Sequence, residues 1–250
     1  RRLTASLPVP VKATLIVVPR AILPQWRSEV QKHAPTLVCA TYSERPGRDA
    51  ASWIASKDVV LVTYDEMQQE MQSARTGTAA ILSCQWWRVV LDEAQMVFNA
   101  AAQAAVLAGE LWRVNGWCST GTPMGNKVDD IHGLLCFLDH DPFADKSCLA
   151  KLLLKPYQNR DPRALAQFRG LMSKFMLRRS KAHVEEEIRL PRCREKTSVV
   201  KLGLSERALY DTLHSELKGE LRRMRGELSM TGAVRAKLEN LRRVCVHPQA

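Results

Sequence analysis

The sequence has no apolar run long enough to cross a bilayer. Its longest apolar stretch, residues 100–111, is rich in alanine and is interrupted by Gln103 and Glu110. A membrane-spanning helix needs about 20 consecutive apolar residues, so we expect no membrane partner. The opening residues, Arg-Arg-Leu-Thr, are followed by no apolar signal core, and nothing in them predicts secretion.

Paired metal-ligating residues are also missing. None of the seven cysteines belongs to a C-x-x-C pair, and none of the six histidines stands at ligand spacing from a cysteine. An odd number of widely spaced cysteines is typical of reduced thiols in an intracellular protein and argues against a disulfide framework. We therefore expect no structural metal site.

The positive charge of the chain lies almost entirely in its second part. Residues 1–144 contain 13 basic and 14 acidic residues, a net charge of −1, whereas residues 145–250 contain 24 and 12, a net charge of +12. Two interpretations remain open: the basic part forms an ordinary solvated surface, or it faces a polyanion such as nucleic acid.

Short apolar runs alternate with helical patterns in the first part of the chain. The β-branched run 14–18, stopped by Pro19, is typical of a strand buried on both faces. Strands that alternate with helices predict a parallel α/β sheet with right-handed crossovers. The expected strands lie at residues 14–18, 37–42, 58–64 and 88–91, and a fifth begins at about residue 116.

After about residue 143 the pattern becomes helical. Leucine-rich stripes run through residues 204–221 and 234–245, separated by a break at 229–232, and stripes of this kind are typical of core seams. We therefore predict an α/β domain at residues 1–143 and an all-helical basic extension at residues 144–250.

The strongest chemical signal is the segment Val89-Val90-Leu91-Asp92-Glu93-Ala94-Gln95. A buried strand here ends in two adjacent carboxylates, at the edge where parallel sheets bind ligands. Nucleotide hydrolysis uses such a pair, because one carboxylate holds the Mg²⁺ on the phosphates while the next orients the attacking water. We assign Asp92 to the metal and Glu93 to the water. The alternative is that the pair only opens a helix, whose positive end favours carboxylates.

A second polar segment follows the next strand. The turn Ser119-Thr120-Gly121-Thr122-Pro123 can hydrogen-bond to the carboxylate pair and report the state of the γ-phosphate. Its alternative role is an ordinary turn with a helix cap.

Taken in order, these segments resemble the helicase motifs of the SWI/SNF family of ATPases. The resemblance covers nearly the whole chain, and the Trp86-Trp87 and Leu154-Lys155-Pro156-Tyr157 segments are most similar to the SHPRH branch, which adds a RING ubiquitin ligase to the motor. The other matching segments are Thr14–Pro19 with Gln25-Trp26, Asp58–Tyr64, Asp92–Gln95, Gly121–Pro123 with Asn126, Phe175–Lys181 and Arg243–Pro248.

The resemblance implies a RecA-like lobe of a two-lobed nuclear motor that hydrolyses ATP with Mg²⁺ and moves along double-stranded DNA, free or in nucleosomes. Asp92 and Glu93 would be its catalytic carboxylates, with Gln95 beside them. Residues 120–122, Thr120, Gly121 and Thr122, would form the coupling turn. Residues 14–19 and the Thr63-Tyr64 turn would lie near the DNA backbone. Arg178, Arg179 and Lys181 would contact DNA from the basic extension; the two arginines are equally suited to pairing with Glu185–Glu187.

The sequence departs from the family pattern at several points. Gln95 stands where much of the family has histidine, and Met124-Gly125 replaces the commoner Ile-Gln. No G-x-x-x-x-G-K-[ST] phosphate loop occurs, no second lobe with arginine fingers follows, and no RING pattern is present. We therefore expect a fragment of a longer protein that is inactive alone and needs the second RecA-like lobe.

The sequence is less consistent with two other functions. A catalytically inactive scaffold that binds DNA or a partner has no need of both carboxylates, so the intact Asp92-Glu93 pair argues against it. An RNA helicase of the same superfamily is disfavoured by the Arg-Arg-Ser-Lys and Cys-Val-His-Pro segments.

Overall fold

The computed structural model describes residues 7–47, 49–74, 79–99, 103–125, 127–180, 191, 194–223 and 232–246. Contacts between residues divide the chain into two units, Arg1–Arg178 and Arg179–Ala250, and each unit is described by itself. None of the helices in these described stretches is long and apolar enough to cross a membrane.

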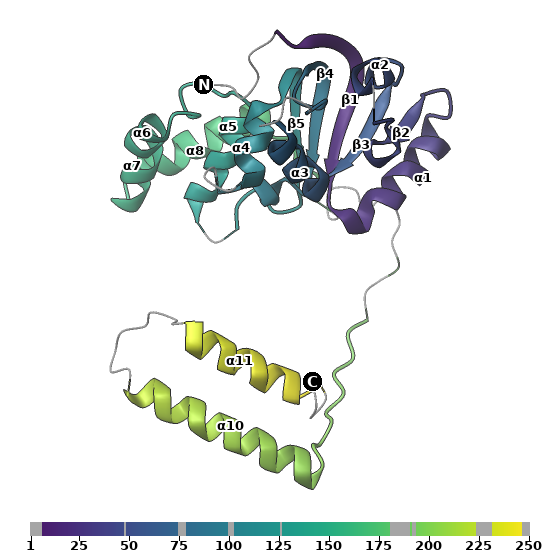
Figure 1. The fold of residues 1–250 in the computed structure, drawn as a ribbon. Coiled ribbons are helices and arrows are strands. Elements are labelled where there is room, and N and C mark those ends of the chain that lie inside the picture. Colours follow the sequence, from purple (N-terminus) through teal and green to yellow (C-terminus); the bar gives the residue numbers. More distant parts are fainter. Residues whose placement is uncertain are drawn as a thin grey trace. The chain divides into compact units, whose positions relative to one another are not determined.

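The first unit is built on a five-stranded sheet whose neighbouring strands are all parallel, in the order β2-β3-β1-β4-β5 (Figure 1). This confirms the predicted parallel α/β architecture. The strands are β1 Val9–Val18, β2 Cys39–Thr41, β3 Val59–Thr63, β4 Cys84–Asp92 and β5 Trp112–Ser119. The expected runs 14–18 and 88–91 lie inside β1 and β4, whereas β2 and β3 are shorter than the expected runs 37–42 and 58–64. Strands β1, β4 and β5 each begin four or five residues earlier than predicted.

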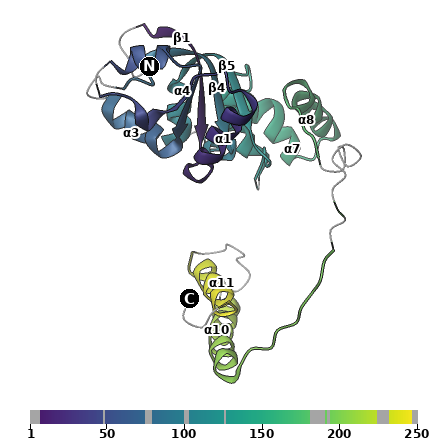
Figure 2. The same ribbon diagram turned by 90° about the vertical axis from the view of Figure 1, so that its right-hand side faces the viewer.

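Helices cover both faces of the sheet, and the side chains of β1 alternate between them because strand residues point to opposite faces in turn. Leu15 and Val17 join the main core under helices α2 to α5, whereas Ile16 and Val18 pack with Trp26 of α1. Helices α3 and α1 accordingly lie on opposite sides of the sheet (Figure 2). The helices are α1 Leu23–His33, α2 Ala50–Ala55, α3 Tyr64–Ala74, α4 Gln103–Glu110 and α5 Ile131–Phe137.

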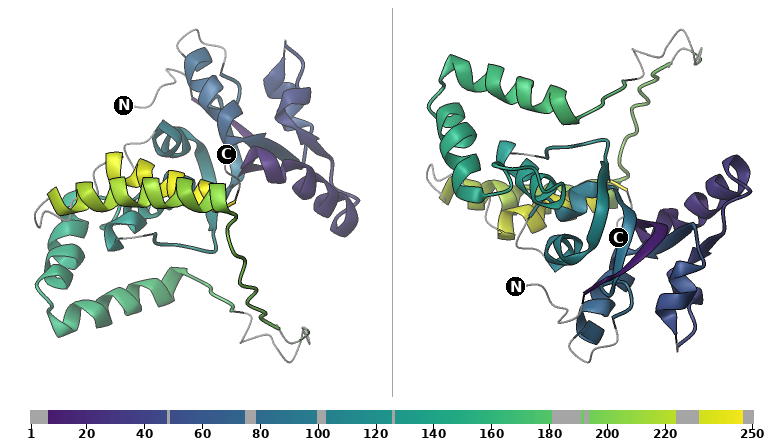
Figure 3. Two further views of the ribbon diagram at one scale, coloured as in Figure 1. Left: turned by 90° about the horizontal axis from the view of Figure 1, so that it is seen from below. Right: turned by 90° about the horizontal axis from the view of Figure 1, so that it is seen from above.

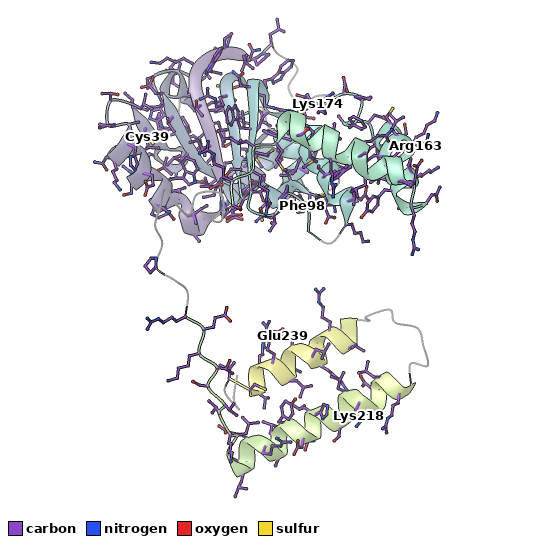
Figure 4. The ribbon with its side chains drawn as sticks, turned by 180° about the vertical axis from the view of Figure 1, so that it is seen from behind. Cys39, Phe98, Arg163, Lys174, Lys218 and Glu239 are labelled. Atoms are coloured by element: carbon purple, nitrogen blue, oxygen red, sulfur yellow. The ribbon has the colours of Figure 1, made fainter. Side chains whose placement is uncertain are left out.

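Helix α5 is buried on two sides, which ties a cluster of further helices to the sheet. Leu134 and Phe137 of α5 lie in the sheet core, whereas Ile131 and Leu135 pack against helices α6 to α8. Figure 3 shows α6 to α8 grouped at one side of the sheet. Arg163 and Lys174 lie at opposite ends of α8 (Figure 4). The added elements are α6 Lys146–Leu149, a π-helical turn Ala150–Leu154, α7 Lys155–Gln158 and α8 Pro162–Phe175.

The division between the units therefore falls later than the boundary expected at residue 143. Leu149, Leu153 and Leu171 share one apolar cluster with α5. Residues 146–175 therefore pack as part of the first unit, although they are helical and rich in basic residues. The apolar packing of these leucines, rather than the basic charge of the segment that carries them, determines which unit residues 146–175 join.

The second unit contains two helices, α10 Leu204–Arg223 and α11 Gly232–Val244. Leu217, Val234 and Leu241 form their buried seam, and Lys237 on α11 pairs with Glu220 on α10 at 2.6 Å. Leu204, Leu209, Leu221 and Leu238 of the expected stripes are exposed instead. The expected break at residues 229–232 lies mostly outside the described residues.

A close backbone contact joins α5 to the short 3-10 helix Ala94–Val97 that follows the carboxylate pair. A Cβ added to Gly133 would lie 1.8 Å from the carbonyl oxygen of Val97, a distance that no side chain tolerates. Glycine is required here because two backbone segments approach each other directly.

We predict that Gly133→Ala lowers the free energy of unfolding of the first unit by at least about 1–3 kcal/mol, because backbone has to move to admit the methyl group. All six tryptophans lie at or before residue 117, so their fluorescence during urea unfolding reports on this unit alone. Gly170→Ala is the matched control, because Gly170 lies in α8 with open space around it and alanine favours helix there by roughly 0.5–1 kcal/mol. Equal stability of Gly133→Ala and wild type would show that this contact is not a constraint.

Candidate ATPase site

The carboxylate pair lies at the carboxyl edge of the sheet. Asp92 is the last residue of β4 and pairs in register with Ser119 at the end of β5. Glu93 follows in a left-handed backbone conformation, with φ 47° and ψ 51°. A non-glycine residue seldom adopts this conformation, and its cost of about 1–3 kcal/mol persists only where the surroundings enforce it. The turn that the pair begins is therefore held by tertiary contacts.

Asp92 is held from three directions. Its Oδ2 accepts the indole N–H of Trp26 at 2.7 Å, and its Oδ1 accepts the backbone N–H of Glu93 at 3.0 Å. Its carbonyl oxygen accepts the Tyr64 hydroxyl at 2.9 Å. Because each carboxylate oxygen accepts about two hydrogen bonds or metal ligations, both oxygens keep capacity for a further partner.

Glu93 is linked to the turn after β5 through Gln95. The Gln95 amide nitrogen donates to Glu93 Oε2 at 2.7 Å, and its amide oxygen accepts the Thr120 hydroxyl at 2.7 Å. Only this orientation of the amide avoids an oxygen–oxygen contact with the carboxylate. Thr120 Oγ1 in turn accepts the backbone N–H of Thr122 at 3.1 Å.

This geometry corrects the expected contact between the turn and the carboxylates. The Thr120 hydroxyl carries one hydrogen, which it donates to Gln95, so the turn reaches Glu93 through the amide. Gly121 has open space where a Cβ would lie, and no steric reason for glycine exists at that position.

Burial raises the pKa of two ionisable side chains near the site, Tyr64 and Cys118. Burial raises the pKa of Tyr64, and the nearby Cys118, Asp92 and Glu93 raise it further, so its hydroxyl stays protonated and remains a donor. Burial also raises the pKa of Cys118 to about 12, which keeps this thiol protonated and unreactive at neutral pH.

The residues expected near DNA lie at separate points of the chain. Residues 14–18 form the end of β1, where Val17 and Val18 are buried, and Thr63 caps α3 by accepting the backbone N–H of Glu66 at 3.1 Å. Arg178 and Arg179 are exposed where the two units meet in sequence. Lys181, and the alternative partners Glu185–Glu187, lie outside the described residues.

Sequence reasoning missed two members of this site. In the sequence Trp26 belongs only to a segment that resembles the family, and Tyr64 only to a turn expected near DNA, yet both side chains donate hydrogen bonds to Asp92. A polar atom on an otherwise apolar side chain is the only signal for such contacts, and it does not identify the partner.

A parallel sheet that ends in paired, hydrogen-bonded carboxylates has the architecture of a RecA-like ATPase lobe. Solved structures have a similar fold. The Sulfolobus solfataricus SWI2/SNF2 ATPase core in complex with dsDNA superposes with a TM-score of 0.61 and 25% identity, over 95% of this chain and 48% of that chain.

Sequence comparison assigns the family. Residues 5–250 match the SNF2-related domain, so the chain belongs to this family of SWI/SNF helicase-like ATPases. DNA repair protein RAD5B of Arabidopsis thaliana is 32% identical over 94% of this chain and 19% of its own length. The human E3 ubiquitin-protein ligase SHPRH is 28% identical over 99% of this chain and 17% of its own. The chain thus spans about a fifth of the length of these relatives, and the resemblance to the SWI/SNF family is confirmed.

We predict that Gln95 and Thr120 stabilise the first unit as one connected path. Gln95→Leu and Thr120→Val should each lower its free energy of unfolding. The loss of unfolding free energy in the double variant should be smaller than the sum of the two single losses by about 0.5–3 kcal/mol, because both changes break the same hydrogen bond. Urea unfolding followed by tryptophan fluorescence measures the free energy of unfolding of the wild type, the two single variants and the double variant. Ser83→Ala, which removes a distant local hydrogen bond to Ala80, should be additive with Gln95→Leu. Additivity of the Gln95 and Thr120 changes would contradict the path.

Proposed function

We propose that this chain is the part of a DNA-dependent ATP hydrolase that carries its metal- and water-handling carboxylates. The observation that supports this most directly is the placement of Asp92 and Glu93 at the carboxyl edge of the parallel sheet, with separate hydrogen bonds to each carboxylate. A residue retained only to open a helix needs no such set of partners.

The donor set fits Mg²⁺. The ion prefers oxygen ligands and keeps several waters, and Asp92 offers two carboxylate oxygens that each retain a lone pair. Bound with ATP, Mg²⁺ would neutralise charge on the phosphates. Asp92 would hold the ion, and Glu93 would orient the attacking water and accept its proton. Gln95 would keep the Glu93 carboxylate turned toward that water.

Phosphate binding and coupling would be divided between this chain and the rest of a longer protein. A phosphate loop and a second RecA-like lobe would complete the site from outside residues 1–250. The Thr120–Thr122 turn would transmit the state of the γ-phosphate through Gln95.

Double-stranded DNA is the proposed partner, free or in nucleosomes, in the nucleus. A related SWI2/SNF2 core was solved with dsDNA, and the related RAD5B is named a DNA repair protein. Arg178, Arg179 and Lys181 would contact phosphates, and such contacts position DNA without reading its sequence. Residues 14–19 and the Thr63-Tyr64 turn would lie near the DNA backbone.

Glu93→Gln in the full-length protein tests the assignment. The amide preserves shape but cannot accept the proton of water, so we expect ATP affinity within about threefold of wild type and turnover reduced at least about 100-fold. Isothermal titration calorimetry measures the binding and phosphate release measures the turnover. Glu29→Gln makes the same charge change on exposed α1 and should leave both unchanged. Turnover of Glu93→Gln near the wild-type rate would remove Glu93 from the mechanism.

A further inference from the structure

Trp26 makes the longest-range polar contact to the carboxylate pair. Its indole Nε1–H donates to Asp92 Oδ2 at 2.7 Å across 66 residues of sequence, from α1 to the end of β4. The indole nitrogen can only donate, and a bond to an ionised carboxylate is shorter and about twice as strong as a neutral one. The side chain therefore brings a strong, directional donor to one oxygen of Asp92.

The indole ring has little freedom to move away. It packs on the face of the sheet that Ile16, Val18 and Leu61 line. The next residue, Arg27, bonds Glu44 at 2.6 Å and so ties the same turn of α1 to the segment after β2. The apolar ring anchors the side chain, and the nitrogen at its edge meets the carboxylate.

Apolar packing alone does not account for Trp26. Phenylalanine or leucine would fill the same face of the sheet without a polar atom. At this position the indole N–H donates to the carboxylate assigned to the metal, and the other carboxylate oxygen accepts the backbone N–H of Glu93. With one donor on each oxygen, rotation of the Asp92 carboxylate about its Cβ–Cγ bond is restricted.

We propose that Trp26 is a positioning residue for metal binding: its N–H fixes the Asp92 carboxylate in the orientation that presents its remaining lone pairs to Mg²⁺. This inference rests on the proposed function, because it needs Asp92 to hold the ion. Hydrogen-bond partners behind a metal ligand orient it, and their loss typically weakens metal affinity or activity 10- to 100-fold.

Metal affinity in the full-length protein provides the main test. Mn²⁺ replaces Mg²⁺ as a probe, and electron paramagnetic resonance measures its binding to the protein in the presence of ATP in a Glu93→Gln background, where no turnover occurs. We expect Trp26→Phe to weaken Mn²⁺ binding about 10- to 100-fold while metal-free ATP binding stays unchanged. Trp86→Phe is the matched control, because it also removes a bonded indole N–H, to Ile81 at 3.1 Å, but away from the carboxylates.

A replacement of Trp26 by β-(3-benzothienyl)alanine separates positioning from packing. Sulfur takes the place of the N–H in a ring of nearly the same shape, so fold stability should be preserved while Mn²⁺ affinity falls as in Trp26→Phe. Wild-type Mn²⁺ affinity in both variants would overturn the positioning role.

The hydrogen bond itself can be followed in this chain without any metal. In ¹H–¹⁵N spectra we expect Asp92→Asn to shift the Trp26 indole resonance more than the other five indole resonances, because the charge of its acceptor is removed. No shift would also overturn the inference. Failure of the wild-type full-length protein to bind Mn²⁺ with ATP would instead contradict the proposed function, and the two failures are thereby distinguished.

Discussion

The parallel register between β4 and β5 is the constraint on which the site depends. Pairing of Asp92 with Ser119 brings the ends of the two strands together, so the turn after β5 lies within hydrogen-bond reach of the turn after β4. The hydrogen bonds from Thr120 to Gln95 and from Gln95 to Glu93 can form only because this register holds. A shift of one residue would also turn the apolar side chains of β4 out of the core, so burial of the sheet and assembly of the site impose the same register.

Two helices on opposite faces of the sheet hold the same turn. On one side α1 places Trp26 against Asp92, and on the other α5 presses Gly133 against the carbonyl of Val97. Helix α5 also packs against α6 to α8, so it contacts both this cluster and the turn that follows Glu93. Glu93, in its left-handed conformation, therefore begins a turn that α1 and α5 contact from opposite faces of the sheet.

The sequence predicted the sheet because its signal is local. The β-branched run of β1 is buried on both faces, and the carboxylates do end β4. The start of β5 could not be predicted, because Arg113 does not resemble a strand residue. Its guanidinium is satisfied by the carbonyls of Ala108, Leu111 and Phe137 and lies over the Phe137 ring, all contacts made after folding. The bonds of Trp26 and Tyr64 to Asp92 were missed for the same reason, since each joins elements distant in sequence.

ATP hydrolysis by the full-length protein, measured with and without double-stranded DNA beside this chain alone, tests the central claim most directly. If the carboxylates of this lobe serve a DNA-dependent ATP hydrolase, DNA should strongly stimulate ATP hydrolysis by the full-length protein, and the isolated chain should show no hydrolysis. Absence of hydrolysis by the full-length protein under both conditions would contradict the account, and the lobe would then be a scaffold whose basic residues bind a partner.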